Sequence, residues 1–185
     1  MPMTSGRARF ALSFLAVVAV AGPGCGAPEA RLLPRSQTWA ELRVVRRGVS
    51  VTPPGEAERA PYPRERLVDG EAITVREGGL GWLRRDGGAT MLVRGPARLV
   101  LRAESVEIAE GRVFVDTPAA GTLTLATPGG PLHLAHVRAS IDAGHDGSTE
   151  AYVLAGEIRS DTEGHEGGRA AAGETLREIF AKSTT

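Results

Sequence analysis

From Trp39 onward the chain alternates apolar and polar residues in short runs, and each run stops at glycine, proline or an Asp-Gly pair. Val113 and Val115 flank Phe114, for example, and leucines alternate with threonines in "TLTL". A period of two places successive side chains on opposite faces of a strand, so each run predicts a half-buried strand. The chain has 24 glycines and 12 prolines to supply turns. We therefore predict an all-β fold of many short antiparallel strands, arranged as a two-layer sandwich or a solenoid.

One stretch, "DGGATMLVRGPARLVL" (Asp86 to Leu101), has two interpretations. Closely spaced glycines suit a phosphate-binding loop, because such a loop brings backbone N–H groups close to the anion. A phosphate loop opens a helix, however, whereas the residues after these glycines alternate as a strand does. We therefore predict two strands with turns at Asp86–Gly88 and Gly95-Pro96, and no bound cofactor. Turn signals of the same kind fall at Glu110-Gly111 and Ala155-Gly156.

The β domain is expected over residues 38–160. Residues 161–185 form a glycine-rich link followed by a tail or a short helix, and Gly173-Glu174 is an alternative point at which the domain closes. The final stretch, "ETLREIFAKSTT", would place Leu176, Ile179 and Phe180 on one side of a helix. This spacing predicts a short amphipathic helix at the C-terminus.

Residues 1–25 have the layout of a secretory signal. Arg7 and Arg9 precede an uncharged run, Phe10–Ala21, that is shorter than the roughly 17–25 residues of a membrane span. Cys25 follows where a bacterial lipoprotein signal places the cysteine that receives lipid. We predict lipidation of Cys25; the alternatives are cleavage after Ala21, which leaves a free thiol, and an uncleaved anchor. All three place the protein outside the cytoplasm, in the periplasm or cell envelope, with residues 26–37 as a flexible tether.

Composition and spacing disfavour several classes of function. The formal net charge is zero, which is unlike a strongly basic nucleic-acid-binding protein. His133 and His136 are three residues apart, which puts them on opposite faces of a strand and makes a shared metal site a poor fit. His145, Asp146 and Ser148 are neighbours in sequence, and such neighbours rarely form a catalytic triad. We expect no metal, no cofactor and no enzymatic activity.

Two sets of residues are candidates for binding. Arg94 and Arg98 flank the predicted Gly95-Pro96 turn and are a candidate partner surface; the simpler interpretation is a solvated face whose side chains lie over apolar neighbours. Aromatic residues make up 4% of the chain. Those that could stack on a glycan are Trp39, Tyr62, Trp82 and Tyr152.

Six strand-and-turn segments follow one another along the chain: "ELRVVRRGVSVT", "LVDGEAITV", "GGLGWLRRDGGATMLV", "VEIAEGRVFVDTP", "TLTLATPGGPLHLAHVRASI" and "TEAYVLAGEIR". This order, from about Thr38 to Leu176, resembles the FecR-like domain, an extracytoplasmic β module of bacteria. The resemblance implies an all-β module that works through protein–protein contacts in envelope signalling. Two departures stand out: "AHVRAS" replaces the usual "GT.F" step, and only nine residues precede the apolar run. We therefore expect that this chain lacks the cytoplasmic sigma-regulating segment of the first FecR proteins.

Signal and strand pattern together predict a non-enzymatic, envelope-anchored protein that binds another envelope protein in signalling or assembly. The alternative hypothesis is a structural or glycan-binding envelope module. Neither hypothesis identifies the partner from the sequence.

Overall fold

A computed structural model describes residues 39–119, 121–161 and 168–179. The predicted all-β class is confirmed: the described residues form twelve strands in one mixed sheet and contain no helix. In the same residues, no segment forms a helix capable of spanning a membrane. The strands are β1 (Ala40–Arg46), β2 (Val49–Thr52), β3 (Glu65–Leu67), β4 (Ala72–Val75), β5 (Leu80–Arg85), β6 (Thr90–Leu101), β7 (Ser105–Asp116), β8 (Thr122–Thr127), β9 (Gly130–Ala143), β10 (Ser148–Ser160), β11 (Arg169–Ala171) and β12 (Thr175–Ile179).

The sheet is folded over on itself into two layers, because β6, β7, β9 and β10 each change pairing partners halfway along. The first half of β6 pairs with β5, for example, and its second half pairs with β4. Layer A has the order β3-β1-β5-β6-β7-β9-β10-β12. Layer B has the order β2-β4-β6-β7-β8-β9-β10-β11, with β7 and β8 parallel.

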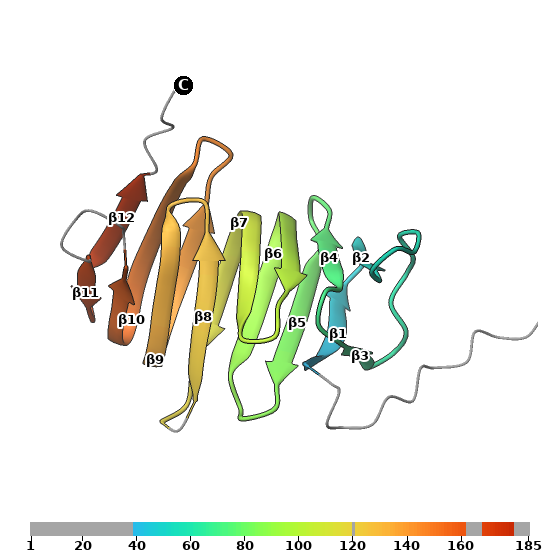
Figure 1. The fold of residues 1–185 in the computed structure, drawn as a ribbon, viewed down its shortest axis with the longest axis horizontal. Helices are drawn as coiled ribbons and strands as arrows, with labels where there is room; N and C mark the ends of the chain where they lie inside the picture. The colour runs from blue at the N-terminus through green and yellow to red at the C-terminus, as the bar shows by residue number, and fades with distance from the viewer. Residues whose placement is uncertain (1–38, 120, 162–167, 180–185) are drawn as a thin grey trace, which may run out of the picture.

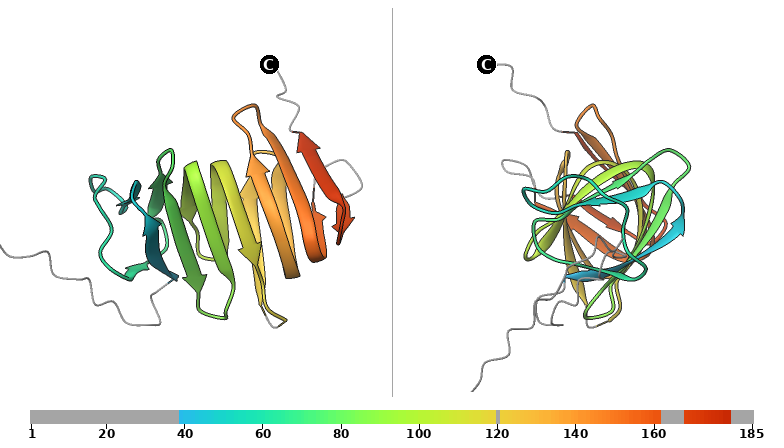
Figure 2. Two further views of the ribbon diagram at one scale, coloured as in Figure 1. Left: turned by 180° about the vertical axis from the view of Figure 1, so that it is seen from behind. Right: turned by 90° about the vertical axis from the view of Figure 1, so that its right-hand side faces the viewer.

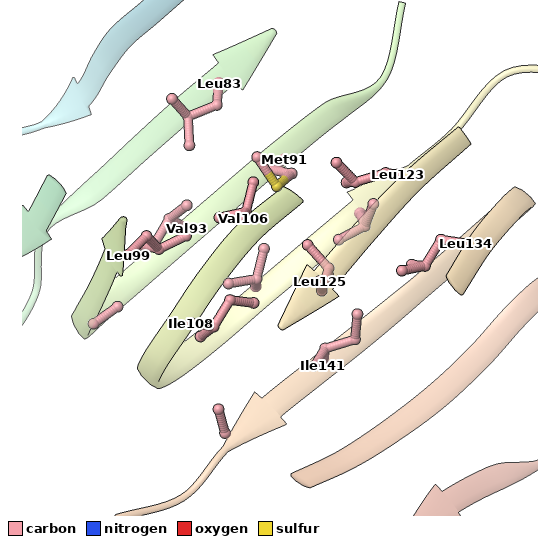
Figure 3. Close-up of a cluster of buried hydrophobic side chains, with 14 of the residues drawn as sticks. Leu83, Met91, Val93, Leu99, Val106, Ile108, Leu123, Leu125, Leu134 and Ile141 are labelled. Atoms are coloured by element: carbon pink, nitrogen blue, oxygen red, sulfur yellow. The ribbon is translucent and has the colours of Figure 1, made fainter. Parts of the chain in front are cut away.

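The layers extend along one axis, with β1–β4 at one end of the molecule and β10–β12 at the other (Figures 1 and 2). Inward-facing aliphatic side chains from both layers fill the space between them. Met91 and Val93 from layer A lie in the same cluster as Leu99 and Ile108 from layer B (Figure 3). Burying such a side chain stabilises the fold by roughly 1.5–3 kcal/mol. The period-two pattern thus determines which side chains are core and which lie on the outer faces.

The four long strands bend along a common line, at Gly95 in β6, Gly111 in β7, His136 in β9 and Gly156 in β10. We call this the fold line. The cross-strand register shifts between Arg94 and Arg98, and again beside Gly156. The predicted turns at Gly95-Pro96, Glu110-Gly111 and Ala155-Gly156 are therefore wrong: each strand continues through its glycine into the other layer. The predicted turn at Asp86–Gly88 is confirmed and joins β5 to β6.

Glycine is required at three positions of this line, Gly95, Gly111 and Gly156, because the strands approach closely there. A Cβ atom at Gly95 would lie 1.9 Å from the carbonyl oxygen of Arg76, and one at Gly111 would lie 2.3 Å from the Cβ atom of Ala97. Gly111 also has a φ of +113°, which L-residues with a side chain rarely adopt. A glycine in a strand pattern therefore marks a crossing between layers as readily as it marks a turn.

His136 is the one member of the fold line that is not glycine, and it has a φ of 54°. The left-handed conformation costs a residue with a Cβ roughly 1–2 kcal/mol. We expect His136→Gly to raise the free energy of unfolding by about 0.5–1 kcal/mol, after the greater flexibility of unfolded glycine is subtracted. Urea unfolding measures this change. Ala135→Gly, at the preceding exposed position, should lower stability instead, and a loss in both variants would contradict the assignment.

The predicted C-terminal helix is wrong over the described residues. Thr175–Ile179 forms β12, which pairs antiparallel with β10; Leu176 lies opposite Ala151 and is buried. Twelve residues are marginal for an isolated helix, whereas the edge of β10 offers hydrogen bonds and a place in the core for Leu176. The pairing with β10 therefore determines the conformation of this segment, although the spacing of its apolar residues also fits a helix.

The loop at residues 53–64 closes the end of the sandwich beside β2. Its Arg59 exchanges two backbone hydrogen bonds with Val51, each 2.9 Å. The Arg59 guanidinium donates to both carboxylate oxygens of the buried Glu65, at 3.0 and 2.7 Å, and the backbone N–H of Tyr62 donates to Glu65 at 2.6 Å. The loop thus covers the backbone edge that β2 would otherwise present to solvent.

Candidate functional site

The outer face of layer A carries a row of outward-facing residues, four of which have large side chains. Direct cross-strand pairing runs from Trp82 on β5 to Leu92 on β6, Phe114 on β7, Ser140 on β9 and Tyr152 on β10. We call these five residues the central row. With strands about 4.8 Å apart, the row spans about 19 Å from Trp82 to Tyr152.

Alternation in each strand places the central row outside. Leu92 lies between the buried Met91 and Val93, and Phe114 lies between the buried Val113 and Val115. Leu92 and Phe114 are themselves only half-buried, because they pack sideways on one another and no other element of the described chain lies over them. Directly opposed aromatic and aliphatic side chains stabilise a sheet, but here they also leave a connected apolar surface facing solvent.

The two ends of the row differ. At the β5 end, the guanidinium of Arg43 lies over the Trp82 ring, 5.3 Å from its centroid, and also donates to Glu41 at 2.9 Å. At the β10 end, Tyr152 is 46% exposed and Leu154, next to it on the surface, is 48% exposed. The Tyr152 ring is therefore free to contact a partner, whereas one side of Trp82 is occupied by Arg43.

A row of mostly charged residues runs beside the central row on the fold-line side. Its cross-strand order is Leu80, Arg94, Arg112, Asp142, Glu150 and Arg177. Arg112 binds Asp142, and this hydrogen bond raises the pKa of the Arg112 guanidinium above its ordinary value. Arg177 binds Glu150 at 3.0 Å. The Arg94 side chain has no ion pair or hydrogen bond with the rest of the described chain.

A second row of mostly charged residues runs along the other side of the central row, with the order Glu41, Arg84, Thr90, Asp116 and Arg138. Arg138 binds Asp116 at 2.9 Å. Arg84 is exposed and, like Arg94, has no partner within the described residues. The apolar row is thus bordered on both sides by charge, which is the usual anatomy of a protein-binding patch.

The outer face of layer B is different in kind. Its corresponding cross-strand row is Val100, Glu107, Ala126 and Pro131, and the strands of the described part of this face carry no outward Phe, Trp or Tyr side chain. Small and polar side chains give a partner little area to bury. Of the two outer faces, layer A therefore offers the better binding surface.

Arg94 and Arg98, which the sequence suggested as one partner surface, lie on different faces of the structure. Arg94 lies on the outer face of layer A and Arg98 on the outer face of layer B, with the fold line between them. They do not flank a turn, because β6 runs through Gly95-Pro96 without one. Arg98 lies opposite Glu110 and its charge helps to lower the pKa of Glu58, after the larger effects of hydrogen bonds from Ser50 and Arg76. Cys25 lies outside the described residues.

The four aromatic candidates are also divided. Trp39 is buried under the guanidinium of Arg85, and Tyr62 lies against Arg59 in the loop at residues 53–64. Trp82 and Tyr152 share the central row. Sequence reasoning missed Phe114 and Leu92 as site residues, although their place between inward-facing residues shows that they point outward. What the sequence does not contain is the register that aligns them.

In the part of the chain that the structure describes, the histidines and acidic residues do not gather into a chemical centre. His133 binds Asp161 at 2.9 Å and His145 binds Glu110 at 2.6 Å, on different parts of the surface. Ser148 donates to Asp146, so the sequence neighbours His145, Asp146 and Ser148 do not form a relay. Within the described residues, no group of three or more His, Cys, Asp or Glu side chains is placed to hold a metal ion.

Comparison with known proteins gives no relative for this chain: no family model, curated protein or solved structure matches it. The candidate site therefore rests on the geometry of the outer face of layer A.

Proposed function

We propose that the chain is an extracytoplasmic, non-enzymatic binding module that contacts another envelope protein through the outer face of layer A. In this proposal Cys25 carries lipid and residues 26–37 tether the module to the membrane. One observation carries the proposed function: Trp82, Leu92, Phe114 and Tyr152 face outward in a single row, interrupted by Ser140, between two rows of charge; the first three are half-buried and Tyr152 is exposed. Aromatic anchors within a charged rim are the typical composition of a protein-binding surface.

We further propose that the module is of the FecR-like type. The family's usual "GT.F.V" step begins with glycine, and this chain has "HVRASI" there. His136 adopts the left-handed φ that glycine favours, and Val137, Ala139 and Ile141 after it are buried. The backbone at this departure is thus one that glycine would favour, and this supports the resemblance although the residue differs.

The second candidate function is glycan binding. It is favoured by the presence of Trp82 and Tyr152 on one face, since sugars stack on exposed aromatic rings. Arg43 already lies over the Trp82 ring, however, and Leu92 offers no ring for stacking. Protein binding would explain all the large side chains of the central row, whereas glycan binding would explain only Trp82 and Tyr152 at its two ends.

The test uses a photo-reactive residue, p-benzoylphenylalanine, at position 152 in the anchored protein in its own cell. Amine-directed cross-linkers are unsuitable because Lys182 is the sole lysine. We expect a defined protein adduct, and we expect Trp82→Ser with Phe114→Ser to reduce its yield at least about tenfold, since buried aromatic anchors dominate interface energies. Val100→Ser with Thr124→Ala makes the matched change on layer B and should leave the yield unchanged. Equal yields from both double variants would refute the assignment.

A further inference from the structure

The charges on the outer face of layer A are distributed unevenly. Over β7, β9, β10 and β12, three arginines face outward and each binds a carboxylate: Arg112 with Asp142, Arg138 with Asp116, and Arg177 with Glu150. This half of the face is electrically balanced within the molecule. A partner of either charge gains little by binding there, because it would have to break existing ion pairs.

Over β1, β5 and β6 the balance is lost. The outward-facing charges are those of Glu41, Arg43, Arg46, Arg84 and Arg94. Glu41 is the one carboxylate and is bound to Arg43. Arg84 and Arg94 have no partner within the described residues. The β5 end of the central row therefore lies in an excess of positive charge.

The two unpaired arginines lie on opposite sides of the Trp82–Leu92 pair, and each borders a hollow. Arg84 lines a polar hollow of about 230 Å³ with Glu41, Arg66 and Asp86. Arg94 lines a second hollow of about 300 Å³ at the fold line, with Glu110 and His145. An apolar pair with a free guanidinium and a hollow on each side is complementary to an apolar group between two carboxylates.

Strand geometry sets the spacing of those carboxylates. Arg84 and Arg94 are on neighbouring strands and four residues apart along the strand axis, because Arg94 pairs with Leu80. At about 3.4 Å per residue and 4.8 Å per strand, their Cα atoms are about 14 Å apart. An extended peptide places residues i and i+4 the same distance apart, about 14 Å.

From this geometry we infer that the β5 end of the face binds an acidic, extended segment of the protein partner. The segment has two carboxylates four residues apart, with an apolar or aromatic side chain midway. Its carboxylates bind Arg84 and Arg94, and its middle side chain packs on Trp82 and Leu92. The inference rests on the proposed function, and it adds the chemistry of the partner. An anionic glycan would satisfy the arginines but has no apolar group for the middle position.

The experiment measures binding of a fluorescent peptide, acetyl-Ser-Glu-Thr-Phe-Thr-Glu-Ser-amide, to the purified chain by anisotropy. We expect the same peptide with both Glu replaced by Gln to bind about three- to tenfold more weakly, since each exposed ion pair contributes up to about 1 kcal/mol. Arg84→Gln with Arg94→Gln should abolish this difference. Arg112→Gln with Arg138→Gln, which removes two paired arginines from the same face, should preserve it. Raising the salt concentration should weaken the acidic peptide selectively.

Three results would overturn the inference: equal affinity for the two peptides, no binding of the acidic peptide at millimolar concentration, or competition by polygalacturonate that is insensitive to Trp82→Ser. The last result would indicate a site for polyanions in general. Failure here is distinguishable from failure of the proposed function. If the native adduct at position 152 is lost in Trp82→Ser with Phe114→Ser but unchanged in Arg84→Gln with Arg94→Gln, the face binds a protein and the acidic segment is wrong.

Discussion

Gly156→Ala is expected to lower the free energy of unfolding by at least about 4 kcal/mol, a loss in the exceptional range for a single methyl group. Gly156 lies where β10 crosses from layer A to layer B, with a φ of +81°. A Cβ atom there would be 2.0 Å from the carbonyl oxygen of His136 on β9. That oxygen is backbone, so relief requires the two strands to separate at the fold line. Urea unfolding followed by circular dichroism measures the loss.

Two control variants separate the cost of the positive φ from the cost of the close approach between strands. Gly78→Ala has the same kind of positive φ but nothing within 4 Å of the new methyl group, so it should cost about 1–2 kcal/mol through backbone strain alone. Gly95→Ala, where φ is not positive, adds a methyl group 1.9 Å from a backbone oxygen and should cost as much as Gly156→Ala. If Gly156→Ala and Gly78→Ala lose the same amount, close approach at the fold line does not constrain the sandwich.

Glu65→Ala is expected to lower the free energy of unfolding by about 2–4 kcal/mol. Glu65 is buried and accepts hydrogen bonds from the Arg59 side chain and from the backbone N–H of Tyr62. Removing the carboxylate leaves that N–H and a three-quarters-buried guanidinium without their partner. The loss is smaller than for a fully buried pair because water reaches Arg59. The same urea titration measures it.

The loop at residues 53–64 covers the edge of β2, and this gives the Glu65→Ala variant a second readout. With Arg59 released, its two backbone hydrogen bonds to Val51 weaken and the edge of β2 is exposed, so the variant should be cut by trypsin within residues 53–64 faster than the native chain. Glu107→Ala is the matched control, because its ion pair with Arg102 is about half exposed on both sides and should contribute less than about 1 kcal/mol. Equal losses in the two variants would show that the loop does not depend on the buried pair.

Much of the fold could be predicted from alternation alone. Inward residues such as Met91, Val93 and Leu125 were identifiable because a strand with one buried face repeats every two residues. The bends at the fold line could not be predicted, because a glycine within a strand pattern is compatible with a turn and with a crossing between layers. What distinguishes them is the oxygen of Arg76 beside Gly95 or of His136 beside Gly156, and those contacts exist only in the folded chain. The spacing of Leu176 from its apolar neighbours fits a helix, but the segment pairs with β10 and therefore forms a strand.

The candidate site was less predictable. The sequence pointed to Arg94 and Arg98, which are four residues apart but on different faces once β6 crosses the fold line. It pointed to Trp82 and Tyr152 separately, seventy residues apart. Their common row depends on four successive strand registers, and a shift of one residue in any of them would send the next side chain into the core. Which arginines lack a carboxylate partner likewise depends on that register.

The most direct measurement of the central claim places p-benzoylphenylalanine at position 92, in the middle of the outer face of layer A, and at position 124, on the outer face of layer B. Both positions are half-buried and outward-facing, so the reactive group should be tolerated equally. After irradiation of intact cells, we expect a protein adduct from position 92 and none from position 124. An adduct from position 124 alone, or from both positions at equal yield, would contradict the claim that layer A is the partner face.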